Sequence, residues 1–453
     1  MAQSENISVA EKLSELAAEK GGTCYYVGGF VRDRLLGIEN KDIDIEVHGI
    51  EPSELEAILD KVGKRISMGE SFGIYSLKGC DIDIAMPRKE TATGKGHRDF
   101  SVLVDPFIGT QKAAIRRDFT VNALMQNVLT GEVIDHFGGL EDLKNGVLRH
   151  VSDASFPEDP LRVLRAAQFA SRFNFTIAEE TIALCRNIDL STLSKERIEG
   201  EMKKALLKAK KPSVFFESLR KMNKLGEWFS ELSNLIGVPQ RHEFHLEGDV
   251  WSHTMMVLDE AAKRREKANY PFGFMMAALC HDFGKPVSTK TENGVTRSIG
   301  HEQAGLTLIN DFLHRITNEH RLIKYVLSLC ELHMRPNMLA SQNSSVKATN
   351  KLFDKAADPN DLILLACADD CGRITEQPKQ SSEEFLFKRL EIFHDIMSRP
   401  FVKGDDLISA GLKPDENFSA ILSHAHKLRL SGTEKEAALR ECLKFAEKRG
   451  RKK

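Results

Sequence analysis

The sequence predicts an α+β protein in which a head of mixed strands and helices precedes a long helical remainder. Up to about residue 150, short apolar runs with strand-like alternation lie between glycine turns and short helices, whereas helical periodicity dominates after Pro160. The chain has 453 residues, which is too many for one hydrophobic core. We expect a head (1–150), a helical neck and body (151–236), a second functional domain built from helices (237–400) and a helical C-terminal segment (401–453).

Local patterns give the elements of the head in chain order. They predict a helix over 5–20, a strand over 23–27, a helix over 31–37, a strand over 42–49 and a strand pair over 71–79 and 80–86. The first helix stops at Gly21-Gly22, and the strand pair turns at Lys78-Gly79. The strand over 42–49 (DIDIEVHG) alternates with period two, so its aspartates share one face.

Composition excludes several classes of protein. With 64 Lys+Arg against 66 Asp+Glu, the net charge of −2 excludes a histone-like polycation but leaves room for a local basic face. The eight cysteines form no CxxC pair, so we expect reduced thiols and a cytoplasmic protein. The N-terminus lacks a signal region, and apolar runs such as 362–368 are too short to cross a bilayer, so no membrane role is expected. No obligatory protein partner is evident.

The strongest constellation of the head is a glycine turn followed by paired aspartates. Gly28-Gly29, between a strand and a helix, lets backbone N–H groups approach phosphates, and Arg32 can add a charge-assisted contact. Asp42 and Asp44 can hold two Mg²⁺ ions that activate a hydroxyl and stabilise leaving pyrophosphate. Two aspartates separated by one residue usually belong to a solvated strand face when no other signal accompanies them. Here the glycine turn upstream favours a metal site. The second pair, Asp81–Asp83, could supply a third carboxylate, but it lacks the glycine turn, and a solvated strand face is the favoured interpretation.

Six motifs in order resemble the bacterial class II tRNA nucleotidyltransferases, the CCA-adding enzymes. They are GGFVRDRLLG, DIDIEV, IRRDFTVNAL, GGLEDLKNGVLRHV, EDPLRVLRAAQFASRF and LSKERIEGEMKKAL, within residues 20–225. The resemblance implies a polymerase-β-like head, the tRNA 3′ end, CTP and ATP as substrates, and a helical neck, body and tail. It places on nucleotide- or metal-site positions Gly29, Arg32, Asp42, Asp44, Arg117, Asp118, Asn122, Asp159, Arg162 and Arg165.

Asp159 and Arg162 suit the selection of bases without a template. Asp159 accepts and Arg162 donates hydrogen bonds, which complements cytosine and adenine but leaves polar groups unpaired against uracil and guanine. The structural alternative is a helix N-terminus, with Asp159 as cap and Pro160 as first residue. Arg116-Arg117-Asp118-Phe119 has an alternative as an ion-paired turn.

Two features differ from the family pattern, namely the residue at position 168 and the loop over residues 87–100. Many relatives place an arginine where this chain has Gln168, and residues 87–100 match the family's flexible loop only loosely.

Basic residues of the neck predict contact with RNA phosphates, although a solvated helix surface is the alternative. They are Lys195, Arg197, Lys203, Lys204, Lys208, Lys210, Lys211, Arg220, Lys221 and Lys224. The basic segment 444–453 predicts a cationic tail.

The third domain carries a second predicted metal site. His253, His281, Asp282 and Asp369 are far apart in sequence but lie in helical patterns, as expected for a metal held between helices. They match the H…HD…D pattern of the HD phosphohydrolase superfamily, and His301 and His333 could complete a second metal position. Mixed ligands suit Mn, Ni, Co, Zn or Fe. The resemblance implies hydrolysis of phosphate esters, including 2′,3′-cyclic phosphates, and an inert structural domain is the alternative.

These observations predict an enzyme that adds C and A to tRNA 3′ ends, with a possible HD phosphohydrolase activity. Three alternatives stay open: an enzyme that adds only CC or only A, a poly(A) polymerase, and a phosphohydrolase or RNA-binding protein whose head is inactive.

Overall fold

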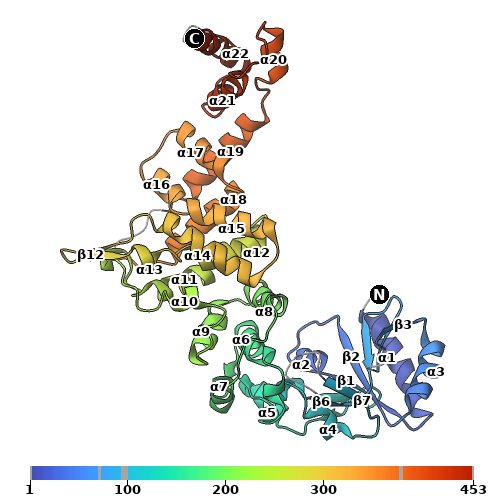
Figure 1. Ribbon diagram of the computed structural model, residues 1–453. Coiled ribbons are helices and arrows are strands. Elements are labelled where there is room, and N and C mark those ends of the chain that lie inside the picture. The colour runs from blue at the N-terminus through green and yellow to red at the C-terminus, as the bar shows by residue number, and fades with distance from the viewer. Residues whose placement is uncertain (1–2, 70–72, 93–99, 377–380, 451–453) are drawn as a thin grey trace. The chain divides into compact units, whose positions relative to one another are not determined.

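The computed structural model describes residues 3–69, 73–92, 100–376 and 381–450 (Figure 1). The chain forms two compact units. The first comprises Met1–Ala205 and Val214–Glu227, and the second comprises Leu206–Ser213 and Trp228–Lys453. Each candidate site below is built within one of them.

A mixed sheet of seven strands is the framework of the first unit. Its order is β3 (Arg65–Gly69), β4 (Ile74–Leu77), β5 (Ile82–Ala85), β2 (Ile43–His48), β1 (Thr23–Val27), β8 (Met125–Asn127) and β9 (Val133–Ile134). β2 runs parallel to β5 and antiparallel to β1. Ile43, Ile45 and Val47 of β2 are buried, which leaves the intervening Asp44 on the other face of the strand.

Helices complete the head around this sheet. α1 (Gln3–Ala18), α2 (Gly29–Leu35) and α3 (Pro52–Val62) contact the sheet or one another. A separate hairpin joins β6 (Arg88–Ala92) to β7 (Phe100–Val104). Residues 93–99, the middle of the segment compared with the family's flexible loop, lie outside the described residues.

The remainder of the first unit is mainly helical. In order come α4 (Thr110–Ala114), η2 (Thr120–Asn122), α5 (Gly139–Asn145), β10 (Val147–Leu148), η3 (Phe156–Glu158), α6 (Leu161–Phe173), β11 (Thr176–Ile177), α7 (Glu179–Cys185), α8 (Lys195–Lys208) and α9 (Ser213–Lys221). α6 buries Val163, Leu164 and Ala167, so its arginines lie on the opposite face.

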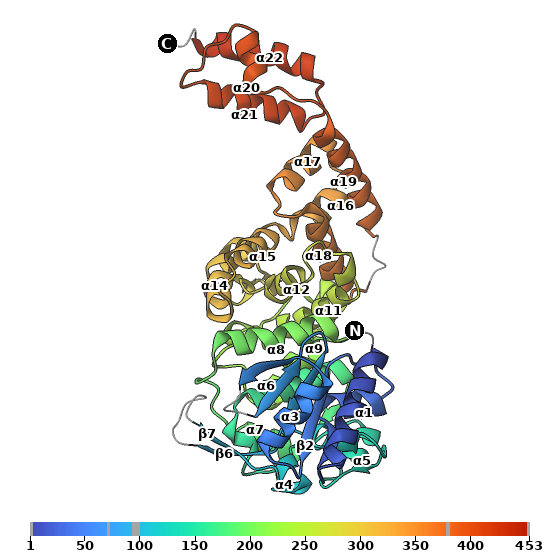
Figure 2. The ribbon, with the colours of Figure 1, turned by 90° about the vertical axis from the view of Figure 1, so that its right-hand side faces the viewer.

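Where the structure describes it, the second unit is helical apart from a small hairpin of β12 and β13; its helices α11 to α22 can be followed in Figure 2. Its elements are α10 (Ser230–Ser233), η4 (His242–Phe244), α11 (Val250–Ala262), η5 (Arg265–Lys267), α12 (Pro271–Cys280), α13 (Lys285–Ser288), β12 (Lys290–Glu292), β13 (Val295–Arg297), α14 (His301–Ile316), α15 (His320–Leu332), α16 (Arg335–Ser341), α17 (Val346–Lys355), α18 (Pro359–Cys371) and α19 (Glu383–Ser398). α12 is buried along Phe272–Cys280 and packs against α11, α15 and α18, which makes it the centre of this core.

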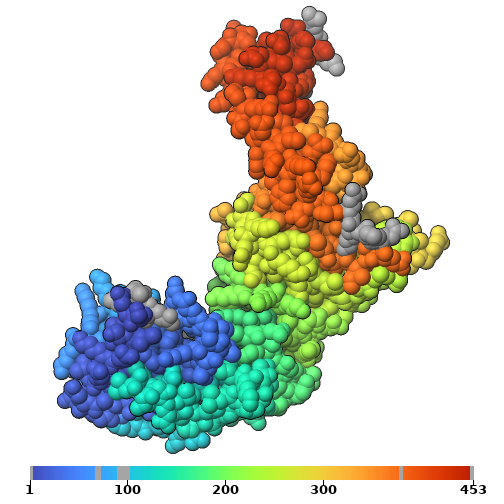
Figure 3. All heavy atoms as spheres, turned by 180° about the vertical axis from the view of Figure 1, so that it is seen from behind, coloured from blue at the N-terminus to red at the C-terminus, as the bar shows by residue number. Residues whose placement is uncertain are grey.

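The C-terminal helices have a small core of their own. α20 (Gly404–Ser409), α21 (Phe418–Arg429) and α22 (Lys435–Gly450), red in Figure 3, pack around Leu407, Ile421 and Cys442. Of the predicted basic tail, residues 451–453 lie outside the described residues. Within the described residues, no helix is both long and apolar enough to cross a membrane.

The predicted fold class is confirmed, with local differences at element ends. The strand over 23–27 is found as predicted, whereas the strand pair is shorter, and α2 begins already at Gly29. His281–Gly284 form a turn between α12, which ends at Cys280, and the short helix α13, which begins at Lys285.

Candidate functional site

The predicted metal-binding aspartates of the head lie beside the glycine turn. Gly28 lies between β1 and α2 with a φ of +67°, and a Cβ added there would lie 3.7 Å from Asp44 Oδ2. Asp44 is half-buried and lies on β2 between the buried Ile43 and Ile45, and the exposed Asp42 directly precedes that strand. Asp83 of β5 is the register partner of Asp44, and the charges of Asp83 and Asp42 both act on the Asp44 carboxyl, so the three carboxylates lie near one another.

Electrostatics at this edge favours a bound cation. Burial raises the pKa of the Asp44 carboxyl; Asp83 and Asp42 raise it further, and Arg117 lowers it. The group offers only carboxylate oxygens, which is the ligand chemistry of Mg²⁺. Among the described residues, the clusters with three ligand atoms within 4.8 Å lie elsewhere. Mg²⁺ commonly binds one or two carboxylates and completes its shell with water and substrate phosphates, so the aspartates present fit this ion.

Arg32 and Arg117 occupy different environments. Arg32 is buried: Nε and Nη2 donate to Asp33 Oδ1 at 2.8 and 2.6 Å, and Nη1 donates to Asn122 Oδ1 at 2.5 Å. Arg117 lies 3.7 Å from the buried Glu46 carboxylate and faces the Gly28 turn. Arg32 therefore holds Asp33 and Asn122 together through buried hydrogen bonds, whereas Arg117 contributes positive charge beside the Gly28 turn.

Asp118 is the centre of a buried network rather than a partner of its arginine neighbours. It accepts hydrogen bonds from Asn122 Nδ2 at 2.9 Å, from the Phe119 N–H at 2.8 Å and from Arg165 Nε at 2.8 Å. Burial opposes its charge, but Arg165 and these donors hold the pKa of Asp118 below its usual range. The network ties the segment before η2 to α6.

Asp159 and Arg162 stand at the start of α6, where both already have partners. Arg162 Nη1 donates to the Ser155 carbonyl and Nη2 to the Arg116 carbonyl, each at 2.6 Å. Asp159 accepts from Arg197 Nη2 at 2.9 Å and from the Leu161 N–H at 3.1 Å. Leu161 is the first helical residue, so the predicted cap is displaced by one position. Sequence reasoning counted Arg197 only as a neck charge and missed its contact with Asp159.

The side chain of Gln168 is inaccessible to a nucleotide. It is 1% exposed, and its Nε2 has no hydrogen-bond acceptor among the described residues. Seven of the basic neck residues are exposed, whereas Lys195, Arg197 and Lys224 are half-buried. The exposed seven are Lys203, Lys204, Lys208, Lys210, Lys211, Arg220 and Lys221.

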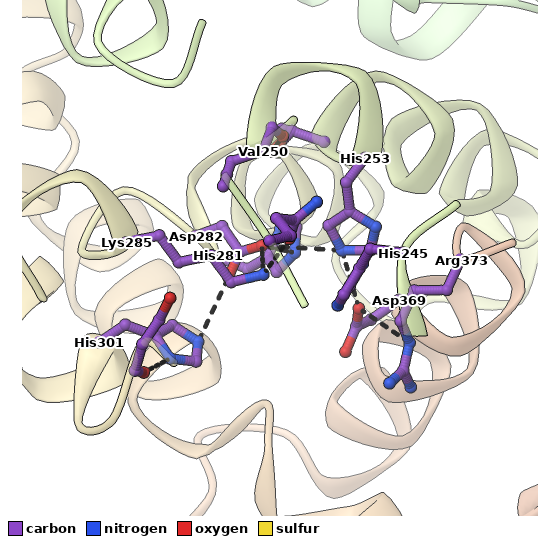
Figure 4. Close-up of polar contacts among 12 residues, drawn as sticks. His245, Val250, His253, His281, Asp282, Lys285, His301, Asp369 and Arg373 are labelled. Carbon is purple, nitrogen blue, oxygen red and sulfur yellow. Dashed lines mark hydrogen bonds and ion pairs between the residues drawn. The ribbon is translucent and has the colours of Figure 1, made fainter. Parts of the chain in front are cut away.

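The second unit brings the predicted HD residues together from separate helices (Figure 4). His253 comes from α11, His281 and Asp282 from the turn after α12, and Asp369 from α18. Ligand atoms of His253, His281 and Asp369 lie within 4.8 Å of one another. Asp282, His301 and His333 form a second cluster on the same criterion. Asp282 joins the two, because Oδ2 is 3.2 Å from His281 Nε2 and Oδ1 is 3.2 Å from His301 Nε2.

Hydrogen bonds orient these histidines for metal binding. The Nδ1 atoms of His281, His301 and His333 donate to backbone carbonyls at 2.8, 2.8 and 2.6 Å. Each neutral ring therefore carries its free lone pair on Nε2, which faces the centre. His301 Nε2 and His333 Nε2 are 3.2 Å apart, and His281 Nε2 makes no hydrogen bond with the residues that the structure describes, although Asp282 Oδ2 lies 3.2 Å away. Lone pairs that face one another need a shared proton or a metal ion between them, and this set of imidazole and carboxylate ligands fits a metal.

Two glycines allow the helices to approach closely enough to form this centre. A Cβ at Gly284 would lie 1.9 Å from the His301 carbonyl oxygen, and one at Gly372 would lie 2.8 Å from the Val257 backbone nitrogen. The first glycine brings α14 to the turn that carries Asp282. The second brings α18, with Asp369, against α11.

Three further side chains border the centre and were not predicted. Glu247 Oε1 accepts from His253 Nδ1 at 3.0 Å and from His245 Nδ1 at 2.8 Å. Lys285 Nζ lies 2.7 Å from Asp282 Oδ2. Glu247 lies in an irregular loop without periodicity, so no local signal indicates it. Lys285 follows Asp282 by three residues, and this spacing could have suggested it.

Comparison with known families gives two matches along the chain. Residues 24–149 match the model of the poly A polymerase head domain, and residues 250–374 match that of the HD domain. The two matched segments contain, respectively, the aspartate site and the complete histidine–aspartate centre.

Comparison with individual proteins extends the likeness over most of the chain. The chain is 40% identical over 366 residues to a multifunctional CCA protein of Cupriavidus metallidurans, covering 77% of this chain and 85% of that protein. Its fold resembles that of the Bacillus stearothermophilus CCA-adding enzyme in complex with CTP (TM-score 0.68, 20% identity, 99% of each chain covered). It also resembles that of the Thermotoga maritima CCA-adding enzyme complexed with tRNA (TM-score 0.63, 22% identity, 98% of each chain covered).

Proposed function

The chain belongs to the family of multifunctional CCA proteins, and on this premise we propose that it adds C and A nucleotides to the 3′ end of tRNA. The substrates are CTP and ATP: the tRNA 3′-hydroxyl attacks the α-phosphate, and pyrophosphate leaves. The observation that carries this proposal is the position of Asp44 beside the Gly28 turn, with Asp83 as its register partner on β5 and the charge of Asp42 acting on the same carboxyl. The cytoplasm is the compartment expected for this reaction.

Asp42 and Asp44 are the proposed holders of Mg²⁺. When bound, the ion would activate the attacking hydroxyl and stabilise the charge on the leaving pyrophosphate. The Gly28-Gly29 turn would let triphosphate oxygens approach the backbone N–H groups, and Arg117 Nη1 lies beside this turn, 2.9 Å from the position of a Cβ added at Gly28. Arg117 would neutralise charge on the phosphates.

Asp159 and Arg162 are the proposed base-selecting pair. Arg162 is oriented by two carbonyls and keeps further N–H groups for a base. Asp159 shares its carboxylate with Arg197, so recognition of the base amino group would require Arg197 to yield an oxygen or to shift. The buried hydrogen bond from Arg165 to Asp118 ties α6, which carries Arg162, to the segment before η2.

The assay of this function is incorporation of radiolabelled CTP and ATP onto tRNA transcripts that lack their 3′ end, with products sized on a gel. We expect the variant Asp42→Ala with Asp44→Ala to lose incorporation while tRNA binding persists. Retained incorporation would refute the metal assignment. Transcripts ending before CCA or at CC distinguish full from partial addition, and long A tails on generic RNA would favour a poly(A) polymerase.

The HD centre supports a second activity, hydrolysis of phosphate monoesters or 2′,3′-cyclic phosphates. His253, His281, Asp282 and Asp369 would hold one metal ion, and Asp282 with His301 and His333 a second. When bound, Mn, Ni, Co, Zn or Fe would lower the pKa of a water and supply the nucleophile. Phosphate release that His281→Ala abolishes, with nucleotide incorporation intact, is the expected result. Phosphate release without any incorporation would instead favour a phosphohydrolase with an inactive head.

A further inference from the structure

A buried carboxylate follows the proposed Mg²⁺-binding aspartates on the same strand of the head. Glu46 lies on β2 two positions after Asp44, so both side chains point to one face of the strand, about 7 Å apart along it. Glu46 is 2% exposed. Its register partners, Tyr25 of β1 (beside β2 in Figure 1) and Ala85 of β5, carry no charge. The sheet itself therefore gives no reason to bury an acid at this position.

Three side chains outside these register positions are the partners of Glu46. His48, two positions further along β2, donates from Nε2 to Glu46 Oε1 at 2.9 Å. Arg116 Nη2 and Arg117 Nη2 each lie 3.7 Å from Glu46 Oε2. His48 is also buried, and its ring packs edge-on against Tyr25. One oxygen of Glu46 is thus held by a neighbour on its own strand, and the other faces the two arginines.

Arg117 extends from this carboxylate to the glycine turn. Its Nη2 faces Glu46, whereas its Nη1 lies 2.9 Å from the position of a Cβ added at Gly28. Asp44 Oδ2 lies 3.7 Å from that same position. Because the guanidinium is planar and rigid, fixing Nη2 also fixes the direction of Nη1. The two ends of this group therefore connect Glu46 to the part of the turn where triphosphate oxygens would bind.

Glu46 also balances the attraction of Arg117 to the aspartates. The charge of Arg117 acts on the Asp44 carboxyl, so Asp44 competes for the guanidinium. An arginine drawn fully to Asp44 would occupy the oxygens that Mg²⁺ needs. A buried ion pair adds little net stability, because removing the charges from water is unfavourable. We therefore interpret the buried Glu46 as a group that orients Arg117 rather than one that stabilises the sheet.

We propose that Glu46 is a positioning residue for nucleotide transfer: by pairing with Arg117 Nη2, it directs Nη1 to the Gly28 turn, where Arg117 binds the triphosphate of the incoming nucleotide. The inference rests on the proposed nucleotidyltransferase function. CTP and ATP carry the same triphosphate, so Glu46 serves both substrates equally. Selection of the base stays with Asp159 and Arg162.

The test measures CTP and ATP incorporation by the full-length protein on tRNA transcripts that lack their 3′ end. For Glu46→Gln, which keeps the size of the side chain and removes its charge, we expect KM for both nucleotides to rise roughly tenfold, with little change in kcat. The inhibition constant of inorganic tripolyphosphate, which has neither base nor sugar, should rise by a similar factor. The ratio of kcat/KM for CTP to that for UTP should not change.

A double-mutant cycle distinguishes positioning from general support of the fold. In an Arg117→Gln background, Glu46→Gln should raise KM no further, because the group that it positions is already absent. Losses that add independently would show that Glu46 does not act through Arg117.

Two further variants complete the test. Glu56→Gln is the matched control, since it removes a carboxylate that pairs at 2.8 Å with Arg65 of the edge strand β3, and it should leave KM unchanged. His48→Phe keeps the aromatic ring and the charge of Glu46 but removes the donor that orients it, and we expect KM for both nucleotides to rise about threefold. If Glu46→Gln does not fold, His48→Phe decides the question, because an unchanged KM in that variant overturns the inference.

The inference is also overturned by an unchanged KM in Glu46→Gln, by a rise for one nucleotide only, or by unchanged inhibition by tripolyphosphate. Wild type that incorporates neither CTP nor ATP would refute the proposed nucleotidyltransferase function itself. Normal incorporation by wild type together with an unaffected Glu46→Gln variant refutes the positioning role alone.

Discussion

Glu247 is the residue that orients the metal-binding face of His253. Its carboxylate accepts from the Nδ1 atoms of His253 and His245 and from the Ile374 N–H at 2.9 Å. Burial opposes the charge of Glu247, but these donors lower its pKa. The carboxylate therefore stays ionised and keeps His253 Nε2 free to bind a metal.

Replacing Glu247 should weaken metal binding without removing a ligand. We expect Glu247→Ala to lower the affinity of the HD centre for Mn²⁺ by about 10- to 100-fold, measured by titration calorimetry of the metal-free protein. Glu247→Gln, which keeps an acceptor oxygen, should lose less. Glu243→Ala in the same loop is the control, because Glu243 is exposed and contacts only Arg241 among the described residues. An unchanged affinity in Glu247→Ala would contradict the positioning role.

Asp118 makes the stability of the head depend on pH. The pKa of its carboxyl is lowered in the fold, so its contribution is fully present above the unfolded value of about 4 and is lost as pH falls through the folded value. We expect Asp118→Asn to cost about 1–3 kcal/mol at pH 7, because Arg165 loses its charged partner.

Urea denaturation of wild type and Asp118→Asn at a series of pH values measures this contribution. The difference should stay constant from pH 7 to 5 and shrink below about pH 4. A difference that grows as the pH falls would show that the direction of the shift is wrong.

At the scale of elements, close helix contacts decide whether the HD residues can meet. A Cβ added at Gly284 would lie 2.6 Å from Gly305 N, and one added at Gly305 would lie 2.9 Å from Gly284 N, so the start of α14 packs closely against the turn after α12. Gly372 does the same for α18 and α11. A side chain at either contact would separate metal ligands that come from different helices.

Gly284→Ala should therefore disable the HD centre selectively. Its Cβ would overlap the His301 carbonyl, so α14 must move away, and we expect loss of metal binding and of phosphate release with normal nucleotide incorporation. Gly200→Ala on α8 is the matched control, because no atom lies within 4 Å of its added Cβ. That substitution should be neutral or stabilise α8 by up to ~1 kcal/mol. Full HD activity in Gly284→Ala would contradict the packing argument.

At the scale of the whole molecule, each site is built within one unit and has its own donor chemistry. The head offers carboxylate oxygens, whereas the HD centre combines imidazole nitrogens with carboxylates. Oxygen ligands suit Mg²⁺, and the mixed set suits transition metals.

Metal removal and replacement should separate the two activities. After chelation, we expect Mg²⁺ alone to restore CTP and ATP incorporation, and Mn²⁺, Ni²⁺ or Co²⁺ to be required for phosphate release. Both assays are run on one preparation of the full-length protein. Restoration of both activities by Mg²⁺ alone, or of neither, would contradict the assignment of separate metals to the two sites.

The sequence indicates the parts of this protein that depend on local pattern. Alternation in DIDIEVHG placed Asp42 and Asp44 on one face of a strand, and the glycine turn before α2 was visible from Gly28-Gly29. His253, His281, Asp282 and Asp369 were identified as one metal site from their residue types and helical surroundings, and the structure brings them together.

The tertiary structure decided what depends on contacts between distant segments. Arg32 and Gln168 are buried, and Asp159 accepts a hydrogen bond from Arg197, which is 38 residues away in sequence. Glu247 accepts a hydrogen bond from His253, and Asp83 is the register partner of Asp44. Periodicity reports which face of an element is apolar, but not which neighbour covers that face. The sequence therefore determines which chemical groups each candidate site contains. The hydrogen-bond partners, the burial and the ionisation of these groups depend on the packing of distant segments.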